Sequence, residues 1–338
     1  MVILHLYDIL KTDSDENHRL TQRQLTELLK SRYGETGDRK TIRKDLALLA
    51  EQDPNIQYDD SRTRIGRTGE EESLTTAWYY SHDFTGAELR LLIDSLLFSK
   101  EIPYSQCREL VGKLKGLSSR YFDAKVNYIR NLPEDQPDNQ QLFYTIDVLD
   151  EAISSNRQVA FHYCEYQTDR QLHERRNSEG KVREYIINPY QIAATNGRYY
   201  LICNYDKYDN ISYYRLELIR EIRVLAAKRK PLKSLPGQKN GLDLPKHMAE
   251  HIYMMSGPSV HVKFRAEKHL LSQIIDWFGK DIRFSDETDT EVTVTVNVNE
   301  DAMFFWLMQY GEYTEVLEPG ELRQRVQQTL KNMSEVYN

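Results

Sequence analysis

Apolar residues recur at helical spacing three times within the first 52 residues. The three stripes are Ile3, Leu6, Tyr7 and Leu10; Leu25, Leu28 and Leu29; and Ile42, Leu46 and Leu49. Thr21 and Gln24 have the spacing of a capping box before the second stripe, and Asp38 is placed to cap the third. Side chains three or four residues apart share one face of a helix. The pattern predicts three short helices around one core, the third over residues 39–52.

The first two turns of the third predicted helix carry a cluster of polar and cationic side chains. They are Arg39, Lys40, Thr41, Arg43 and Lys44, and the first acid after them is Asp45. Helix-turn-helix proteins place this end of their recognition helix in the major groove. We therefore interpret these residues as DNA-binding. The alternative is a solvated helix face of mixed charge.

The next segment has the pattern of a wing. Residues 56–58 and 63–65 predict two strands joined by a turn at residues 59–61, and residues 78–80 predict a further strand. Arg62 and Arg64 are placed to reach DNA phosphates. Three short helices with a basic third helix and a wing resemble a winged helix-turn-helix domain, expected over residues 1–80.

Residues 84–137 are predicted to form a helical linker. Thr85 and Glu88 have capping-box spacing, Pro103 is placed to start a second helix, and residues 131–139 contain two prolines among polar residues. A helix resumes over residues 140–155. The apolar stripes of these helices indicate core packing or a dimer seam.

The central region predicts consecutive strands rich in tyrosine. Asn196 and Gly197 predict a tight hairpin between two alternating runs. In the strand predicted over residues 211–218, Tyr213, Arg215 and Glu217 share one face. About half of the 23 tyrosines lie between residues 144 and 214. Aromatic rings near cations suit the stacking of bases with phosphates held nearby, so this face is a candidate pocket for an anion.

Three stretches of this region carry a family resemblance: Pro189-Tyr190, Tyr199-Tyr200-Leu201, and Tyr214 to Ile219. They resemble the WYL domain of bacterial transcriptional regulators, with Tyr199 where the family name has tryptophan. The resemblance implies a small Sm-like or SH3-like β-barrel over residues 138–228 that senses a nucleic acid or nucleotide. The candidate ligand-binding residues are Tyr163, Tyr190, Arg198, Tyr200, Tyr213 and Arg215. The alternatives are that Arg215 pairs with Glu217 or a distant acid, and that each tyrosine packs in the core.

The C-terminal third predicts a connector over residues 229–257 and a separate domain over residues 258–338. Strand and helix patterns alternate in that domain, with Val292, Val294, Val296 and Val298 on one strand face. The stretch from Glu315 to Pro319 before the last helix resembles the WCX extension. That resemblance implies an α/β ferredoxin-like domain linked to dimer contacts. The predicted fold is therefore a multidomain α+β protein.

Composition and motifs exclude several classes of protein. The 338 residues carry a net charge of −7, which argues against a protein that coats nucleic acid but permits a local basic surface. Three distant cysteines predict neither disulfides nor a zinc ribbon, and no run of about 18 apolar residues occurs. We expect a cytoplasmic protein without membrane partners.

His247 to His251 fits the H-x-x-E-H pattern of zinc peptidases, but no third ligand is apparent. We predict no catalytic residue, metal or cofactor.

The leading hypothesis is a homodimeric transcription regulator that binds a palindromic double-stranded DNA operator and responds to a nucleic acid or nucleotide effector. The alternative is an accessory factor that binds single-stranded nucleic acid without operator specificity. A zinc hydrolase is the third hypothesis. The sequence leaves open whether the regulator represses or activates.

Overall fold

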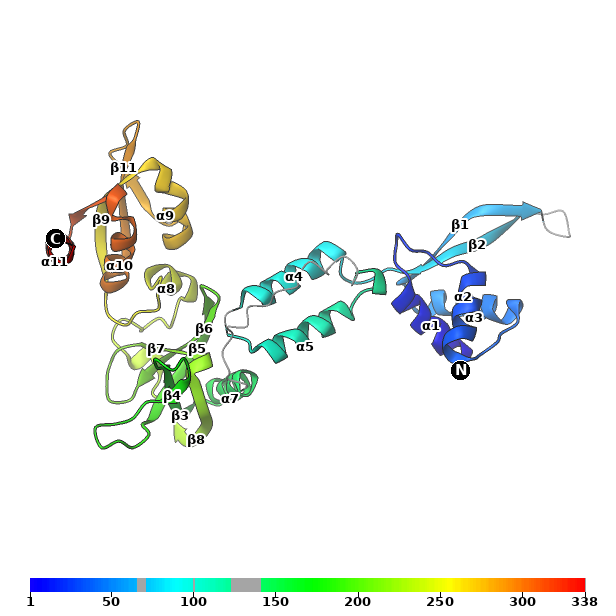
Figure 1. The fold of residues 1–338 in the computed structure, drawn as a ribbon, viewed down its shortest axis with the longest axis horizontal. Coiled ribbons are helices and arrows are strands. Elements are labelled where there is room, and N and C mark those ends of the chain that lie inside the picture. Colours follow the sequence, from blue (N-terminus) through cyan, green and yellow to red (C-terminus); the bar gives the residue numbers. More distant parts are fainter. Residues whose placement is uncertain (66–70, 100, 123–140, 338) are drawn as a thin grey trace. The chain divides into compact units, whose positions relative to one another are not determined.

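The computed structural model describes residues 1–65, 71–99, 101–122 and 141–337 (Figure 1). The chain divides into two compact units, residues 1–138 and 139–338. Both units combine helices and β-sheets. The stretch at residues 131–139, predicted to be a linker, lies outside the described residues.

The N-terminal unit begins with three helices around one core: α1 (Val2–Asp13), α2 (Gln22–Tyr33) and α3 (Arg39–Gln52). Each predicted stripe contributes to that core, where Leu6, Leu25 and Ile42 have no exposed surface. The predicted capping box at Thr21 is confirmed, and Asp38 caps α3 by accepting a 2.7 Å hydrogen bond from the amide of Lys40. The apolar pattern therefore predicted this part of the fold correctly.

A two-stranded antiparallel sheet follows, formed by β1 (Ile56–Ile65) and β2 (Glu71–Tyr80). The predicted turn at residues 59–61 was wrong, because these residues lie within β1. The strand register shifts between Gln57 and Asp59 and again between Asp59 and Arg62. Pairing on both sides outweighs the local turn preference, so the polar triplet becomes an irregularity in the ladder. Residues 78–80, predicted to form a separate strand, are the end of β2.

Helices α4 (Gly86–Phe98) and α5 (Tyr104–Lys115) pack side by side through Leu89, Ile93 and partly buried apolar residues. The segment after α5 is attached to the three-helix core. Arg120 forms a 2.7 Å ion pair with the buried carboxylate of Asp13, and Ser119 donates a 2.7 Å hydrogen bond to Asp15. These polar contacts tie the helical pair to the N-terminal domain.

The second unit begins with α7 (Leu142–Ser154) and a six-stranded antiparallel sheet. Its strands are β3 (Arg157–Tyr166), β4 (Leu172–Glu174), β5 (Glu184–Thr195), β6 (Arg198–Tyr205), β7 (Ser212–Arg215) and β8 (Ile219–Lys228). The neighbour order is β4-β3-β5-β6-β7, and β8 pairs with β3. Asn196 and Gly197 join β5 to β6 with φ angles of 53° and 73°. These left-handed angles are those of a tight hairpin turn, as the sequence predicted.

The sheet curls, so that rings from strands that are not neighbours meet inside it. The ring of Tyr214 on β7 lies 4.9 Å from that of Tyr163 and 5.2 Å from that of Phe161, both on β3. Tyr185 of β5 completes the cluster. Several tyrosines of the enriched region are therefore core residues, which was the alternative interpretation.

The strand predicted over residues 211–218 was too long. β7 ends at Arg215, and Leu216–Leu218 form a short 3-10 helix, η1. Continued alternation would have placed Glu217 on the same open face as Arg215. The turn instead buries the Glu217 carboxylate, where two arginines contact it. The ion pairing of a buried acid explains why the strand stops there.

The connector contains η2 (Leu232–Ser234) and α8 (Leu244–Glu250). The C-terminal domain follows with a four-stranded sheet in the order β10-β11-β9-β12. Its elements are β9 (Ser259–Glu267), η3 (Lys268–Leu270), α9 (Leu271–Phe278), β10 (Arg283–Ser285), β11 (Glu291–Asn299), α10 (Glu300–Tyr310), η4 (Gly311–Tyr313), β12 (Thr314–Glu318) and α11 (Gly320–Val336). The four alternating valines of β11 are buried, as predicted.

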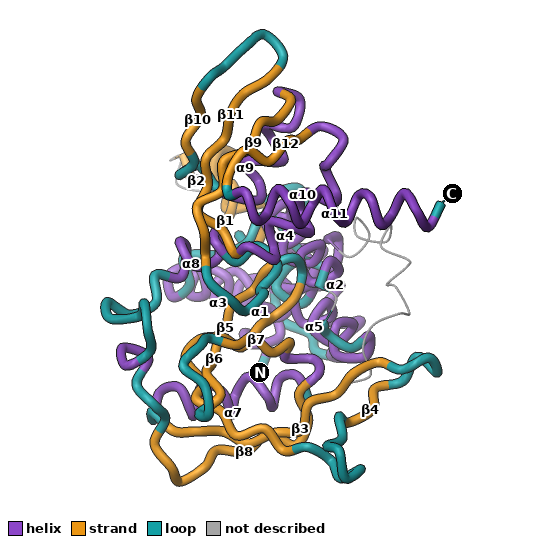
Figure 2. Tube along the Cα trace, turned by 90° about the vertical axis from the view of Figure 1, so that its left-hand side faces the viewer, coloured by secondary structure: helices purple, strands orange, loops and turns teal. Residues whose placement is uncertain are grey.

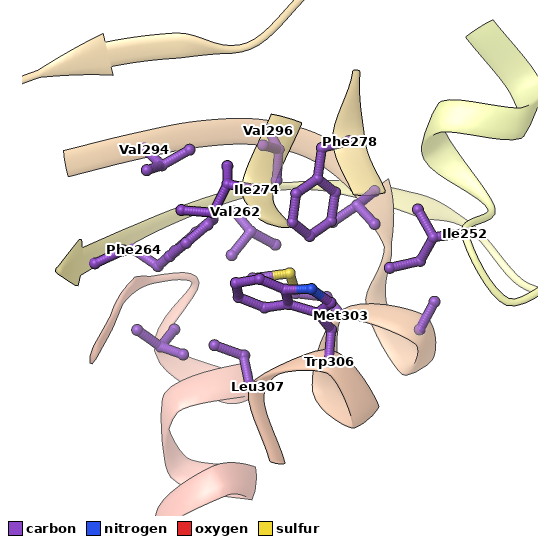
Figure 3. Packing of buried hydrophobic residues seen from close by; sticks show 14 of the residues in the cluster. Ile252, Val262, Phe264, Ile274, Phe278, Val294, Val296, Met303, Trp306 and Leu307 are labelled. Carbon is purple, nitrogen blue, oxygen red and sulfur yellow. The ribbon is translucent and has the colours of Figure 1, made fainter. Parts of the chain in front are cut away.

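The core of this domain surrounds Trp306 of α10, which is fully buried (Figure 3). Its ring lies 5.5 Å from that of Phe264 and 5.1 Å from that of Phe278. Val262, Ile274 and Val294 close the cluster. Among the described residues, every helix is too short or too polar to cross a membrane.

Candidate DNA-binding surface and ligand site

Helix α3 presents all five of its predicted DNA-binding side chains to solvent. Arg39, Lys40, Thr41, Arg43 and Lys44 are exposed. Ile42 and Leu46 on the other side are buried. Within the described part of the chain, none of the four cations forms an ion pair with an acid. The start of α3 is therefore a compact positive surface that is open to an anionic partner.

The exposed start of α3 is held in place by hydrogen bonds. Asp38 accepts 2.7 Å hydrogen bonds from the Thr41 hydroxyl and the Lys40 amide, and these lower the pKa of Asp38. Gln22 of α2 donates a 2.6 Å hydrogen bond to the carbonyl of Arg39. The cap and the contact with α2 fix the direction in which this end of α3 points.

The two predicted wing residues lie on β1. The backbones of Arg62 and Arg64 pair with those of Leu74 and Glu72 on β2. Their side chains lie outside the part of the chain that the structure describes. Their contact with phosphates stays a prediction.

Four of the six predicted ligand residues line one face of β6 and β7. Tyr200 lies opposite Arg215 and Ile202 lies opposite Tyr213, while Arg198 precedes Tyr200 by two residues. Opposed residues and residues two apart share a face of a sheet. The structure therefore brings two guanidinium groups and two phenol rings together on one surface.

Glu217 joins the two arginines of this surface. Arg198 Nη1 and Arg215 Nε each donate a 2.6 Å hydrogen bond to Glu217 Oε1. The Glu217 side chain is 1% exposed, whereas the two arginine side chains are 28% and 30% exposed. The cluster keeps one net positive charge, and each guanidinium has five N–H donors. The pairing with Glu217, which was the alternative interpretation of Arg215, thus holds both cations next to each other at the surface.

Tyr163 lies on the inner side of the curled sheet. Its hydroxyl accepts a 3.2 Å hydrogen bond from the backbone N–H of Arg215, and burial raises the pKa of Tyr163 to about 12. Its ring is part of the aromatic core, so Tyr163 supports the backbone beneath Arg215.

Tyr190 contacts a different segment from the other predicted ligand residues. Its hydroxyl donates a 3.0 Å hydrogen bond to the carbonyl of Lys230, and the guanidinium of Arg229 lies 5.4 Å from its ring centre. Burial raises the pKa of Tyr190 to about 12. These contacts anchor the chain that leaves β8.

The connector packs on the same face as the arginine pair. Met254 forms a small buried cluster with Ala193 and Ile202, joined by Leu244, Met248 and the rings of Tyr200 and Tyr213. Tyr213 Oη lies 2.7 Å from His247 Nε2. Part of the predicted ligand face is therefore covered by the connector helix α8.

Two family models match the chain. Residues 144–224 match the WYL domain, and residues 257–334 match the WCX domain. The chain carries a WYL domain followed by a WCX domain. The first match covers most of α7 and most of the curled sheet, and the second covers the four-stranded domain. The resemblance seen in the tyrosine-rich stretches is confirmed.

One curated relative is the "Uncharacterized HTH-type transcriptional regulator YobV" of Bacillus subtilis (strain 168). The two proteins are 24% identical over 166 residues. That match covers 48% of this chain and 49% of the relative, so the chain matches about half of the relative's length.

Two solved structures show weaker similarity. Proteasome accessory factor B/C (PafBC) of Arthrobacter aurescens is 14% identical, with a TM-score of 0.28 and coverage of 96% of this chain and 47% of that one. A CRISPR Cas-related protein is 13% identical, with a TM-score of 0.36 and coverage of 99% and 80%. Scores of this size do not establish a shared fold.

The H-x-x-E-H residues of α8 and its C-cap His251 link the WYL domain to the WCX domain. His247 contacts Tyr213, and the Nδ1 atom of His251 donates a 3.0 Å hydrogen bond to the carbonyl of Met255. Glu250 accepts hydrogen bonds from Ser259 at 2.9 Å and from Asn297 at 2.8 Å. Each of the three side chains therefore has a protein partner. The Glu250 contacts reach β9 and β11 of the WCX sheet.

Because His247 and its neighbour His251 are buried, we expect the protein to be less stable toward unfolding in acid. Burial, with a smaller effect from His251, lowers the pKa of His247 from 6.5 to about 4. A base whose pKa is depressed in the folded state loses stability as the pH falls below its unfolded pKa. Lowering the pH from 7.5 to 5 should reduce the free energy of unfolding by up to about 2 kcal/mol through this residue.

Urea unfolding of the wild type and of His247→Gln at both pH values measures this effect. The variant should lose that part of the pH dependence, because glutamine keeps a hydrogen-bonding group but does not titrate. His173→Gln is the control, since His173 is an exposed partner of Asp169. An equal pH dependence in His247→Gln and the wild type would contradict the prediction.

Two features of the arginine and tyrosine face on β6 and β7 could not be predicted from the sequence. The sequence indicated Glu217 as a competitor of the ligand for Arg215, whereas Glu217 contacts Arg198 as well. The H-x-x-E-H pattern drew attention to His247, but it did not predict the contact with Tyr213. A long separation in sequence, 34 residues between Tyr213 and His247, hides the second contact. The contact between Glu217 and Arg198 had one sequence signal, the alternating pattern around Arg198.

Proposed function

We propose that this protein is a ligand-responsive, DNA-binding transcription regulator. In this proposal α1–α3 with β1 and β2 form a winged helix-turn-helix, and a homodimer binds a palindromic operator. The curled WYL sheet acts as a small Sm-like barrel that senses a nucleic acid or nucleotide. The exposed cationic start of α3 carries the proposal, and the HTH-type regulator among its relatives supports it.

The proposed role of α3 is to enter the major groove. Its buried side holds Ile42 and Leu46 in the core, so the opposite side is free to meet DNA. The Asp38 cap and the Gln22 contact fix the first turn, and this lowers the entropy lost on binding. A two-fold dimer would place two such helices in successive major grooves of a palindrome.

The proposed ligand surface is the arginine pair with its neighbouring rings. Arg198 and Arg215 suit a phosphate, because guanidinium groups bind phosphate oxygens through paired hydrogen bonds. Tyr200, opposite Arg215, offers a ring for a base. This combination favours a nucleotide or a single-stranded nucleic acid over an uncharged ligand.

The proposed signal passes through α8. Tyr213 lies two residues before Arg215 on β7, and it contacts His247 of α8. Glu250 of the same helix contacts Ser259 and Asn297 of the WCX domain. A ligand that binds one arrangement of this junction more tightly shifts the population toward it. We propose that the WCX domains then change the geometry of the dimer, and with it the affinity for the operator.

Binding assays with the full chain test this function. The duplex upstream of the protein's own gene, a random duplex and a single strand of equal length are compared at one salt concentration. A regulator should prefer one duplex by about 10³ over random duplex. Equal binding of both duplexes would refute operator recognition.

The second candidate is an accessory factor that binds single strands. The arginine and tyrosine surface on β6 and β7 favours it, because such surfaces bind single-stranded nucleic acid without reading sequence. Preference for any single strand over every duplex would select this function. Identifying the nucleic acid or nucleotide that copurifies with the protein would name the effector in either case.

A further inference from the structure

Three metal-binding side chains meet at the edge of the WYL sheet, away from the arginine pair. His162 Nδ1 lies 2.8 Å from Glu174 Oε1 and 3.3 Å from Glu221 Oε2. One ligand atom from each residue lies within 4.8 Å of the other two. The residues come from β3, β4 and β8, which meet in the sheet (Figure 2). Three separate strands thus bring one imidazole nitrogen and two carboxylates together.

An irregularity in β8 brings the third ligand into place. The register between β3 and β8 shifts between Ala160 and His162, and Glu221 in that shift has a φ angle of 51°. A bulge of this kind turns a side chain away from the direction set by regular alternation. The Glu221 carboxylate reaches His162 even though the strand partner of His162 is Arg220.

A hydrogen bond from His162 can serve only one of the two carboxylates of this cluster. The Nδ1 atom of His162 carries at most one hydrogen, so it can donate to only one of the two carboxylates. Glu184, the β5 partner of His162, is paired with Arg223 at 2.5 Å. Arg220 on β8 is the strand partner of His162 and a further cation of this region. A divalent cation in place of the imidazole proton would bind both carboxylates at once.

We propose that His162, Glu174 and Glu221 form a zinc site. A histidine nitrogen with carboxylate oxygens is a typical donor set for Zn²⁺, and the affinity order of divalent metals favours Zn²⁺ over Mn²⁺. Metal–ligand bonds of about 2.1 Å in tetrahedral geometry place ligand atoms roughly 3.4 Å apart. The 2.8 Å and 3.3 Å separations therefore need to open by about 0.6 Å and about 0.1 Å, while the two carboxylate oxygens already lie within 4.8 Å of each other. Water would complete the coordination.

Zinc at this site would cross-link β3, β4 and β8. Strand β4 is three residues long and pairs only with β3 among the strands of the described sheet. Its position thus depends on few backbone hydrogen bonds, and a metal that ties Glu174 to β8 would hold it. The proposal does not depend on the regulatory function, because it concerns other residues and has its own measurement.

Titration calorimetry with Zn²⁺ on the metal-stripped full chain tests the site. The wild type should bind one Zn²⁺ per chain and unfold at a higher temperature with Zn²⁺ present. His162→Gln should weaken binding on the order of 100-fold, and Glu174→Gln and Glu221→Gln at least about tenfold. Glutamine keeps the size of each side chain, and far-ultraviolet circular dichroism checks the fold.

Two controls separate this site from other histidines. His173→Gln removes an exposed histidine paired with Asp169 and should leave zinc binding unchanged. His251→Gln, in the H-x-x-E-H segment, should also leave it unchanged. Zinc binding that is lost with His251→Gln but kept with His162→Gln would overturn the proposal. So would the absence of zinc binding at micromolar concentrations.

Discussion

Replacing Arg43 and Lys44 together by alanine should lower operator affinity on the order of 100-fold and flatten its salt dependence. Each cation that contacts a phosphate releases a counterion, so loss of two contacts should reduce the slope of log affinity against log salt by about 2. Both side chains are exposed on α3 and contribute nothing to its core, so the fold should be unaffected. Fluorescence anisotropy with the operator duplex at several salt concentrations measures both quantities.

The control is a variant with the same loss of charge on another surface. Lys239 and Lys280 are exposed and lie in the other unit, and alanine at both positions changes the net charge equally. This variant should bind the operator with nearly wild-type affinity and slope. If it weakens binding as much as the α3 variant, the effect reflects net charge, and α3 is not the recognition helix.

Replacing Arg215 by alanine should abolish the response to the effector while operator binding without effector is kept. The change removes one of two guanidiniums from the WYL surface and leaves Arg198 to hold the buried Glu217 carboxylate. Affinity for a fluorescent single-stranded oligonucleotide of about ten nucleotides should fall roughly 100-fold. Arg215→Lys keeps the charge but loses the forked geometry, so it should show a smaller loss.

A second arginine–glutamate pair provides the matched control. Arg223 on β8 pairs with Glu184 at 2.5 Å and lies outside the proposed ligand surface. Arg223→Ala should leave oligonucleotide affinity unchanged. A response to the effector that persists in Arg215→Ala, with the fold intact, would refute this ligand site.

The helices and hairpins that could be predicted from the sequence are those set by local chemistry. The stripe of Ile42 and Leu46, the Asp38 cap and the Asn196-Gly197 turn each depend on residues a few positions apart. The failed predictions concern residues whose structure depends on partners far away in the sequence. Residues 59–61 have turn chemistry, yet they lie inside β1 because β2 pairs with residues on both sides of them. The strand expected through Glu217 ends early because two arginines neutralise that acid in the interior.

The residues of the candidate ligand site also fall into a group that strand alternation predicts and a group that it does not. Alternation puts Arg198 and Tyr200 on one face of β6, and it puts Tyr213 and Arg215 on one face of β7. The pairing of the two strands makes these faces one surface. Tyr163 and Tyr190 share only their residue type with the other candidates. The structure places Tyr163 in the aromatic core and Tyr190 against Lys230, because composition does not show which side of a curled sheet a tyrosine occupies.

The sequence by itself determined the long helices, the Asn196-Gly197 turn and the presence of the WYL and WCX domains, because periodicity, caps and family motifs are read from neighbouring residues. Only the tertiary structure decided that Glu217 holds two arginines together and that α8 contacts Tyr213. It alone also brought His162, Glu174 and Glu221 together from three strands. Such contacts join residues far apart in the chain. They form only when the sheet curls and the connector packs against it.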